Sequence, residues 1–393
     1  MNKARLFLGA MGAMALASGT VFGGSSDART AQVAAKKAVT PCRATIAIEA
    51  PLTGSSLAQL GLETLHFTEL AVAHDNAVNH TKVTLAQDDT QFTPSIAITK
   101  AQAIISSNAV AVVGPASSGE AAAVGPLFAR AQIAFVSGSA TNPTLTTSGA
   151  NPTFFRVVPP DSVQGPQDAN YIAKVLKPKA VMIVDDESSY STDLVSQITP
   201  ILQAAGIAVT HESYNGSATG VPDFSSIVSG VTPAQTVMIL PWQNASSAQQ
   251  FGLDLSAQGK TATIFGTDGT DSPTQFKITG SIVSNFGPDI STSKNPYDVA
   301  IVKGVKKYGP YGSFGVPNYA ATDVEMQAIA AVCKARHKPT RANVLAAVRK
   351  TNILPSAIGQ RITFQKDGDL KNGKFYLFKI NSAGAYIPIA SKS

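Results

Sequence analysis

The sequence predicts an α/β fold in which parallel sheets are flanked by helices, arranged as two units of similar size. Short apolar runs alternate strictly with helical stretches, first over residues 44–137 and again, after Pro159-Pro160, over residues 162–265. Parallel strands need a crossover connection between them, usually a helix, so this alternation predicts parallel sheets. An apolar content of 44% in 393 residues indicates a folded globular protein of one or two domains.

The first unit begins with the run ATIAIEA, which is expected to form a strand, followed by a turn at Gly54. Apolar residues near helical spacing then predict a long helix. The expected strands are 44–50, 82–87, 110–113 and 133–137, and the expected helices are 57–79, 94–106 and 119–130.

The second unit repeats this pattern and is followed by a helical segment and terminal strands. The expected strands are 180–186, 207–211, 236–240 and 263–265, and the expected helices are 162–176, 193–205, 224–231 and 246–258. Beyond them we expect a polar loop over 281–296, helices near 296–307, 319–335 and 340–351, and a β-ribbon over 361–389 with a turn at 367–369. Doubly wound sheets bind ligands beyond the carboxyl ends of their strands, so the turns after the strands are the expected place for a site.

The first residues have the pattern of a secretory signal peptide. Met1–Arg5 is short and basic, residues 6–22 are apolar, and Ser26-Asp27-Ala28 offers a cleavage site of small residues. We expect a signal peptide over 1–28 and a flexible leader over 29–41. A retained membrane anchor is the alternative, although a spanning helix needs about 20 apolar residues. The expected location is periplasmic or secreted.

The chain has two cysteines, Cys42 and Cys333. An even pair in an exported protein suggests a disulfide, and two separate buried thiols are the alternative. Nothing near either cysteine suggests a metal site.

The composition and the motifs argue against several classes of function. The net charge of +6 is spread along the chain, with only a short basic cluster at 334–341, so nucleic-acid binding is not expected. The segment Gly259-Lys260-Thr261 lacks the earlier glycine of a phosphate-binding loop, and the segment 291–294 fits S-x-x-K without its companion motifs. The five histidines show no metal-ligand spacing. We expect no catalytic residue, cofactor or metal.

One turn stands out as an anion site. In "VVGPASSGEAAAVGP", residues 112–126, an apolar run ends at Gly114-Pro115 and two serines precede an alanine-rich helical stretch. Free N–H groups and hydroxyls at the start of a helix attract anions. Similar turns rich in Ser, Thr, Gly and aromatic residues follow other strands, and they offer hydrogen bonds without a nucleophile or a general base. This pattern is typical of a binding site.

Several segments together carry a resemblance to a known family. "IAIEAPLTGSSLAQLG", "DDTQFTPSIAITKAQAII", "FFRVVPPDSVQGPQDANYI" and "ITFQKDGDLKNGKFYLFKI" occur in an order that resembles the type I periplasmic solute-binding proteins, in their leucine/isoleucine/valine-binding branch. The resemblance covers about residues 44–390. It implies two Rossmann-like lobes joined by a three-crossing hinge, with the first lobe formed by 42–159 and 288–359 and the second by 160–287 and 360–393.

The resemblance also implies roles for residues of the first lobe. Ser118, with Ser117 beside it, would hold the carboxylate of an amino acid through its hydroxyl and N–H groups. The Ser139 carbonyl would accept from the ammonium of the ligand, with Ala140 next to it, and Thr141 would reach the carboxylate. A role for Ser118 as a helix cap alone is the alternative.

In the second lobe the resemblance implies that Tyr190 closes over the ligand and that Asp268 pairs with its ammonium. Trp242, Leu60 and Phe314 would line the side-chain pocket. Asp268 is shorter than the glutamate of some members, and Leu60 stands where relatives often have an aromatic residue. A core position for Trp242 and a turn cap for Asp268 are the alternatives.

We therefore expect a non-enzymatic, exported substrate-binding protein of an ABC importer. It would be a monomer that binds a branched-chain, other aliphatic or aromatic amino acid by hinge closure and delivers it to a membrane permease. A sensory ligand-binding protein of the same fold, for an amide or an aromatic acid, is one alternative. A hydrolase acting on a small amide is another, but it needs a nucleophile with a positioned base, which the sequence does not offer.

Overall fold

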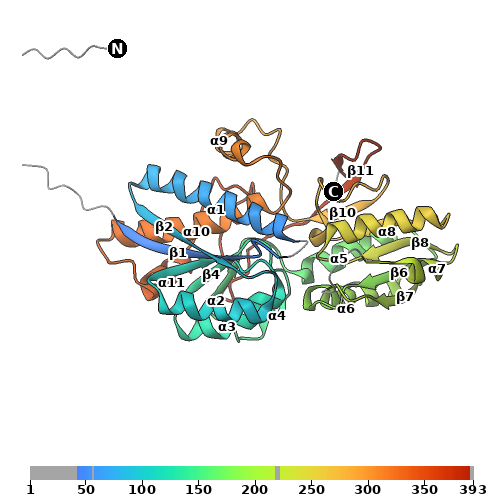
Figure 1. Cartoon of the computed structure of the whole chain (residues 1–393), viewed down its shortest axis with the longest axis horizontal. Helices are drawn as coiled ribbons and strands as arrows, with labels where there is room; N and C mark the ends of the chain where they lie inside the picture. Colours follow the sequence, from blue (N-terminus) through green and yellow to red (C-terminus); the bar gives the residue numbers. More distant parts are fainter. Residues whose placement is uncertain (1–41, 55–56, 217–221, 390–393) are drawn as a thin grey trace, which may run out of the picture. The chain divides into compact units, whose positions relative to one another are not determined.

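The structure is a computed structural model that describes residues 42–54, 57–216 and 222–389. The expected signal peptide and leader lie outside the described residues. The described chain forms two largely parallel sheets flanked by helices (Figure 1), which confirms the fold class predicted from the alternation of strands and helices. No helix in these three ranges is long and apolar enough to cross a bilayer.

The first sheet has the strand order β2-β1-β3-β4-β5, and every neighbouring pair is parallel. Its strands are β1 (Arg43–Ala50), β2 (Lys82–Asp89), β3 (Ala109–Val113), β4 (Ala134–Ser137) and β5 (Phe154–Arg156). The strand β5 is not expected from the sequence, because three residues are too few to show a period. All five residues of β3 are buried, as expected for a central parallel strand covered on both faces.

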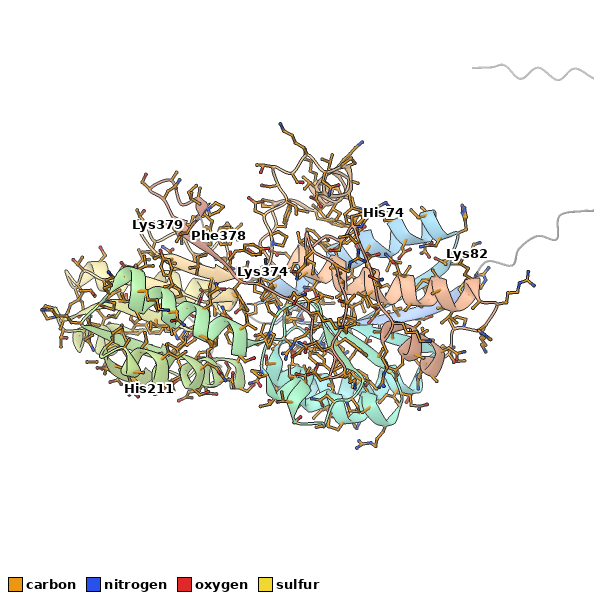
Figure 2. All side chains as sticks on the ribbon, turned by 180° about the vertical axis from the view of Figure 1, so that it is seen from behind. His74, Lys82, His211, Lys374, Phe378 and Lys379 are labelled. Atoms are coloured by element: carbon orange, nitrogen blue, oxygen red, sulfur yellow. A yellow bond between two sulfur atoms is a disulfide. The ribbon has the colours of Figure 1, made fainter. Side chains whose placement is uncertain are left out.

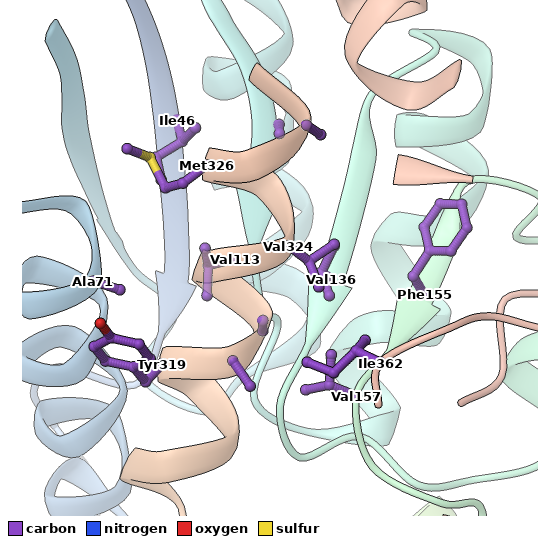
Figure 3. Packing of buried hydrophobic residues seen from close by; sticks show 14 of the residues in the cluster. Ile46, Ala71, Val113, Val136, Phe155, Val157, Tyr319, Val324, Met326 and Ile362 are labelled. Carbon is purple, nitrogen blue, oxygen red and sulfur yellow. The ribbon is translucent and has the colours of Figure 1, made fainter. Parts of the chain in front are cut away.

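Helices cover both faces of the first sheet. One apolar cluster joins its strands to α1, α9, α10 and α11, and a second cluster joins them to α2 and α3 on the opposite face (Figure 1). Figure 3 shows Val324 and Met326 of α10 over these strands. The helices are α1 (Ala58–Asn79), α2 (Pro94–Ser106), α3 (Ser118–Arg130), α4 (Thr144–Thr147), α9 (Pro296–Val305), η3 (Lys306–Tyr308), α10 (Gly315–Lys334) and α11 (Arg341–Val348).

A disulfide joins Cys42 to Cys333, so the two cysteines are paired with each other and are not separate thiols. Cys42 immediately precedes β1, and Cys333 lies in the last turn of α10. The bond therefore ties the first strand of the sheet to a helix whose cysteine comes 291 residues later in the chain.

The second sheet has the strand order β12-β11-β10-β9-β8-β6-β7. Its strands are β6 (Ala180–Asp185), β7 (Ala208–Ser213), β8 (Gln235–Leu240), β9 (Thr263–Gly266), β10 (Ile282–Asn285), β11 (Tyr376–Ile380) and β12 (Tyr386–Pro388). The pairs from β7 to β10 are parallel, and β11 and β12 are added antiparallel. The prediction of a loop over 281–296 is wrong at its start, because β10 forms there. Ser284 and Asn285 are polar, so the segment lacks the apolar pattern that predicts a strand. In the structure both side chains are buried and hydrogen-bonded to buried aspartates.

Helices also cover the second sheet on both faces, with α5 and α6 in one apolar cluster and α7 and α8 in another. The helical segments are α5 (Asp161–Tyr171), η1 (Ile172–Leu176), α6 (Ser189–Ala204), α7 (Ser225–Ser229), α8 (Ala245–Ala257) and η2 (Asp268–Thr270). The helix α6 begins four residues before the expected start at 193, because the Ser188 side chain caps it by accepting from the N–H of Ser191. This early start places Tyr190 in the first turn.

The chain passes between the two units three times. It leaves the first sheet after β5, returns after β10 to form α9 to α11, and leaves again before β11. The segment after residue 360 first packs on the first sheet, where Ile362 (Figure 3), Phe364 and Leu370 join its apolar cluster. A turn at 367–369 lies between the paired residues Phe364 and Leu370, while the terminal ribbon proper consists of β11 and β12.

Candidate functional site

A pocket lies where turns that follow strands of both sheets meet. The space between its walls is about 320 Å³, and this figure includes open solvent at the mouth of the pocket. The lining residues are Leu60, Phe92, Ala116, Ser117, Ser118, Ser139, Tyr190, Gln243, Asp268, Gly269 and Phe314. Seven of the ten ligand contacts expected from the sequence are among them; Ala140, Thr141 and Trp242 are not.

The turn between β3 and α3 supplies two serines to the pocket. Gly114 starts this turn with φ of 104°, and a Cβ there would meet the Glu49 carbonyl at 2.3 Å, so only glycine fits. Ser117 is the N-cap of α3: its Oγ accepts from the N–H of Glu120, and the Glu120 carboxylate accepts from the Ser117 N–H and hydroxyl. This capping box holds the first turn of α3, including Ser118, against the pocket. A helix N-terminus of this kind favours an anion.

The loop after β4 contributes one further hydroxyl. Ser139 lines the pocket, and its Oγ donates to the carbonyl of Ala116 at 2.7 Å, which ties this loop to the serine turn. Ala140 and Thr141 are fully buried behind the lining. A direct contact of these two residues with a ligand therefore stays a prediction.

A fully buried cation holds the loop after β4 in place. Arg156 of β5 donates from Nη1 to the carbonyls of Ala140 and Asn142, at 3.4 and 2.8 Å. Its Nε pairs with Asp369 Oδ1 at 2.6 Å. A buried charge is tolerated when it is paired and hydrogen-bonded, as here. The ion pair therefore links the loop after β4 to the segment around Asp369, which precedes β11.

The opposite wall of the pocket is acidic. Tyr190, in the first turn of α6, places its hydroxyl 2.7 Å from both Asp268 Oδ1 and Thr267 Oγ1. Asp268 follows β9 and is 2% exposed. The Gly269 N–H donates to the Tyr190 oxygen at 3.3 Å. Sequence reasoning expected Tyr190 and Asp268 at the site, and the structure places them in contact with each other.

Burial controls the ionisation of this wall. It raises the pKa of Asp268 to about 7, although the Tyr190 hydroxyl and Gln164 favour the charged form. The neighbouring Asp161 is fully buried, and burial together with the charge of Asp268 raises its pKa well above the usual range. Asp161 therefore keeps its proton more readily than Asp268 does, and Asp268 is the member of the pair that can carry a charge near neutral pH. A cation in the pocket would stabilise the charged form of Asp268.

Trp242 does not line the pocket, which corrects the expectation from the sequence. Its indole is fully buried, stacks on Phe224 with 5.0 Å between ring centroids, and donates from Nε1 to the Val184 carbonyl at 2.6 Å. The ring fills the core beside the second sheet. The next residue, Gln243, lines the pocket instead.

The remaining lining includes apolar side chains, two of which, Phe92 and Ala116, are not expected from the sequence. Leu60 and Phe314 lie in the pocket as expected, and they belong to a small apolar cluster with Phe286. Phe92 also lines the pocket from the turn after β2, where its φ is 58°. Its position directly after the strand of the "DDTQF" segment was the signal that could have identified it.

The described residues contain no group of three or more His, Cys, Asp or Glu that could hold a metal ion. Figure 2 shows His74 and His211 on different units of the described chain. The pocket instead offers hydroxyls and a helix N-terminus on one wall and a carboxylate on the other. Such a pair of walls can bind both poles of a small zwitterion without chemistry.

Comparisons with known proteins find relatives over nearly the whole described chain. A sequence profile of the family described as periplasmic binding protein matches residues 44–385. Leu/Ile/Val-binding protein homolog 3 of Brucella melitensis is 26% identical over 85% of this chain and 90% of its own length. The Leu/Ile/Val-binding protein BraC3 of Rhizobium johnstonii is 28% identical over 85% of this chain and 91% of its own.

Solved structures of similar fold include a leucine-binding protein LivK of Thermotoga maritima, with a TM-score of 0.77 and 22% identity. The match covers 88% of this chain and 98% of that protein. LivJ of Streptococcus pneumoniae, solved in complex with isoleucine, has a TM-score of 0.75 at 19% identity, covering 88% of this chain and 99% of that protein. At these identities the similarity establishes the fold.

Proposed function

Because the chain belongs to the periplasmic binding protein family, we propose that it is the substrate-binding protein of an ABC importer. In this proposal it captures an α-amino acid between its two units and delivers the amino acid to a membrane permease. The chain acts by binding alone and catalyses no reaction. It works as a monomer in the periplasm or outside the cell, in agreement with the signal-like residues 1–28.

One observation carries the proposal: the pocket has Ser118 at a helix N-terminus on one wall and Asp268 on the other. An α-amino acid carries an anion and a cation on one carbon. The carboxylate would accept from the first turn of α3, and the ammonium would pair with Asp268. Because each unit supplies the partner of one pole, a ligand favours the arrangement in which both units face it.

The side chain of the ligand would lie against Leu60, Phe92 and Phe314. These apolar walls support a branched-chain, other aliphatic or aromatic amino acid. The names of the relatives, which are Leu/Ile/Val-binding proteins, support the same preference. Thr141 and the Ser139 carbonyl are proposed as further contacts that a ligand would reach by small movements of the loop after β4.

We propose lobes close to those expected from the sequence, with one adjustment. The first lobe holds residues 42–159 and 288–370, and the second holds 160–287 and 371–389. The end of the first lobe moves from 359 to 370 because Ile362, Phe364 and Leu370 pack on the first sheet. The three passages between the lobes would form the hinge.

Calorimetry on refolded, ligand-free protein with a panel of amino acids tests the proposal. We expect saturable binding of one or more apolar amino acids, with the ligand recovered unchanged. Conversion of a panel member to a product would overturn the non-enzymatic function. Absence of binding across the whole panel would overturn the assignment of an amino acid as ligand.

A further inference from the structure

Asn142 contacts both units at the edge of the pocket, although it does not line the pocket itself. It lies in the loop after β4 and is 6% exposed. Its N–H donates to Ser118 Oγ at 3.2 Å, and its carbonyl accepts from Arg156 Nη1 at 2.8 Å. Its side-chain Nδ2 donates to the carbonyl of Ser189 at 2.8 Å. Since Ser189 begins α6, which packs on the second sheet, this bond joins the two units directly.

The local hydrogen bonds fix the orientation of the Asn142 amide. Its Oδ1 accepts from the Thr144 N–H at 2.9 Å and from the Thr144 hydroxyl at 2.6 Å. A flipped amide would place NH₂ against the N–H donor of Thr144 and an oxygen against the Ser189 carbonyl, and both contacts would be repulsive. The turn at the start of α4 therefore aims the donor end of the amide at the second unit.

The bond lies beside residues that face both poles of the proposed ligand. On the first unit Asn142 bonds Ser118, and on the second unit Ser189 directly precedes Tyr190, whose hydroxyl contacts Asp268. The units also approach closely here, since a Cβ on Gly119 of α3 would lie 3.7 Å from Ser189 Oγ.

We propose that Asn142 is a positioning residue that fastens the two walls of the ligand pocket together through its bond to Ser189. The bond adds to the stability of the arrangement in which both walls face the ligand, and it makes no contact with the ligand. Its consequence for affinity rests on the proposed function, whereas its effect on the arrangement of the two units does not.

The hydrogen bond from Asn142 to Ser189 can be removed without removing the bonds that hold Asn142 in the first unit. The loop after β4 is held by Arg156 and Ser118 through the backbone of Asn142, and the turn into α4 is held through Oδ1. Only Nδ2 reaches the second unit. Asn142→Asp keeps the size and the acceptor oxygen but replaces the donor by an oxygen that faces the Ser189 carbonyl.

Two further variants make the test specific. Thr144→Val removes one of the two donors that orient the amide and serves as a milder variant should Asn142→Asp fold poorly. Asn170→Asp is the matched control, because the Asn170 Nδ2 donates to the Pro166 carbonyl at 2.7 Å within α5, inside one unit.

The measurement is the distance between spin labels on the two units in solution, without added ligand. The labels are attached to cysteines introduced as Gln102→Cys on α2 and Ser196→Cys on α6, both at exposed positions. The two native cysteines are paired in the disulfide and so do not take up the label. We expect Asn142→Asp to reduce the ratio of short to long distances about three- to tenfold, as the loss of one net hydrogen bond allows. Thr144→Val should act in the same direction and less strongly. The melting temperature should stay close to that of the parent.

Several results would overturn the proposal. They are an unchanged distance distribution in Asn142→Asp and Thr144→Val, an equal shift in Asn170→Asp, and a parent protein with no short-distance population. Failure of the calorimetric panel would overturn the proposed ligand and leave the distance measurement as it stands, so the two failures are distinguishable.

Discussion

The two walls of the pocket are built on different physical principles. The wall on the first unit uses neutral groups, Ser117, Ser118 and Ser139, held by a capping box and by bonds between neighbouring turns. The wall on the second unit uses a carboxylate, Asp268, whose charge depends on its surroundings. The neutral wall is preorganised by the capping box and by the backbone. In the proposed function, the acidic wall pairs with an ammonium only when Asp268 is ionised.

The largest expected effect comes from removing the acidic wall. Asp268→Ala should weaken amino-acid binding about a hundredfold or more, because the ligand ammonium would be buried without a counter-charge. Calorimetry with the best member of the amino-acid panel measures the loss. Asp268→Asn is the matched control for size and should recover little of the affinity. Parent-like affinity in both variants would show that the ammonium lies elsewhere.

The next effect separates the stability of the first unit from the binding function. Replacing Cys42 and Cys333 by serine should lower the free energy of unfolding by about 2–4 kcal/mol, since the unfolded chain is no longer closed into a long loop. Denaturant unfolding measures this change. Ligand affinity in the folded variant should match that of the parent, because neither cysteine lines the pocket. A large loss of affinity would contradict the view that the disulfide acts only on stability.

A pair of adjacent serines tests the neutral wall. Ser118→Ala should weaken binding about tenfold or more through loss of a hydrogen bond to the ligand carboxylate, and it should also lower the stability, because the buried N–H of Asn142 loses its acceptor. Ser117→Ala is the matched control and should lower the stability by about 1 kcal/mol, because it removes the N-cap of α3. Calorimetry and thermal unfolding of both variants distinguish the two roles. An equal loss of affinity in the two variants would contradict this division.

The smallest expected effect is a pH dependence of the acidic wall. With the pKa of Asp268 near 7, affinity for an amino acid should rise about tenfold between pH 6 and pH 8, as the carboxylate loses its proton and becomes able to pair with an ammonium. Titration calorimetry at several pH values measures the slope. Asp268→Asn should remove the slope, and a flat profile in the parent would contradict the ionisation of Asp268 in this range.

The same group predicts the opposite trend for stability without ligand. Its pKa is about 7 in the folded protein and about 4 in an unfolded chain, so the folded state binds more protons between these values. The contribution of Asp268 to the free energy of unfolding should therefore fall as pH rises from about 4 to about 7. Above about pH 7 this contribution should stay constant. A smaller decline in Asp268→Asn would assign that part of the trend to this residue.

The fold was largely predictable because strict alternation of apolar runs and helices leaves few arrangements other than parallel sheets. The elements that were missed have specific causes. β5 is only three residues long, and β10 carries Ser284 and Asn285, whose burial depends on aspartates distant in the sequence. The sequence of β10 alone does not show that these distant aspartates will be its hydrogen-bond partners.

The site was predictable where residues directly follow strands. The serine turn, Tyr190 and Asp268 lie in such turns, and the structure brings them to one pocket. The choice between Trp242 and Gln243 was not predictable, because adjacent residues of an extended segment point in opposite directions and both directions are occupied. The contact of Asn142 with Ser189 was equally hidden, since it depends on how the two units meet.

The first unit is assembled from two stretches of chain that are separated by most of the second. Its sheet is complete at β5, but α10, which covers one face of that sheet, and the partner of Cys42 come only after β10. A chain made from its N-terminus therefore carries a sheet with one face only partly covered while the strands from β6 to β10 are synthesised. The later helices and the disulfide close the earlier half, so the order of synthesis and the order of completion are different.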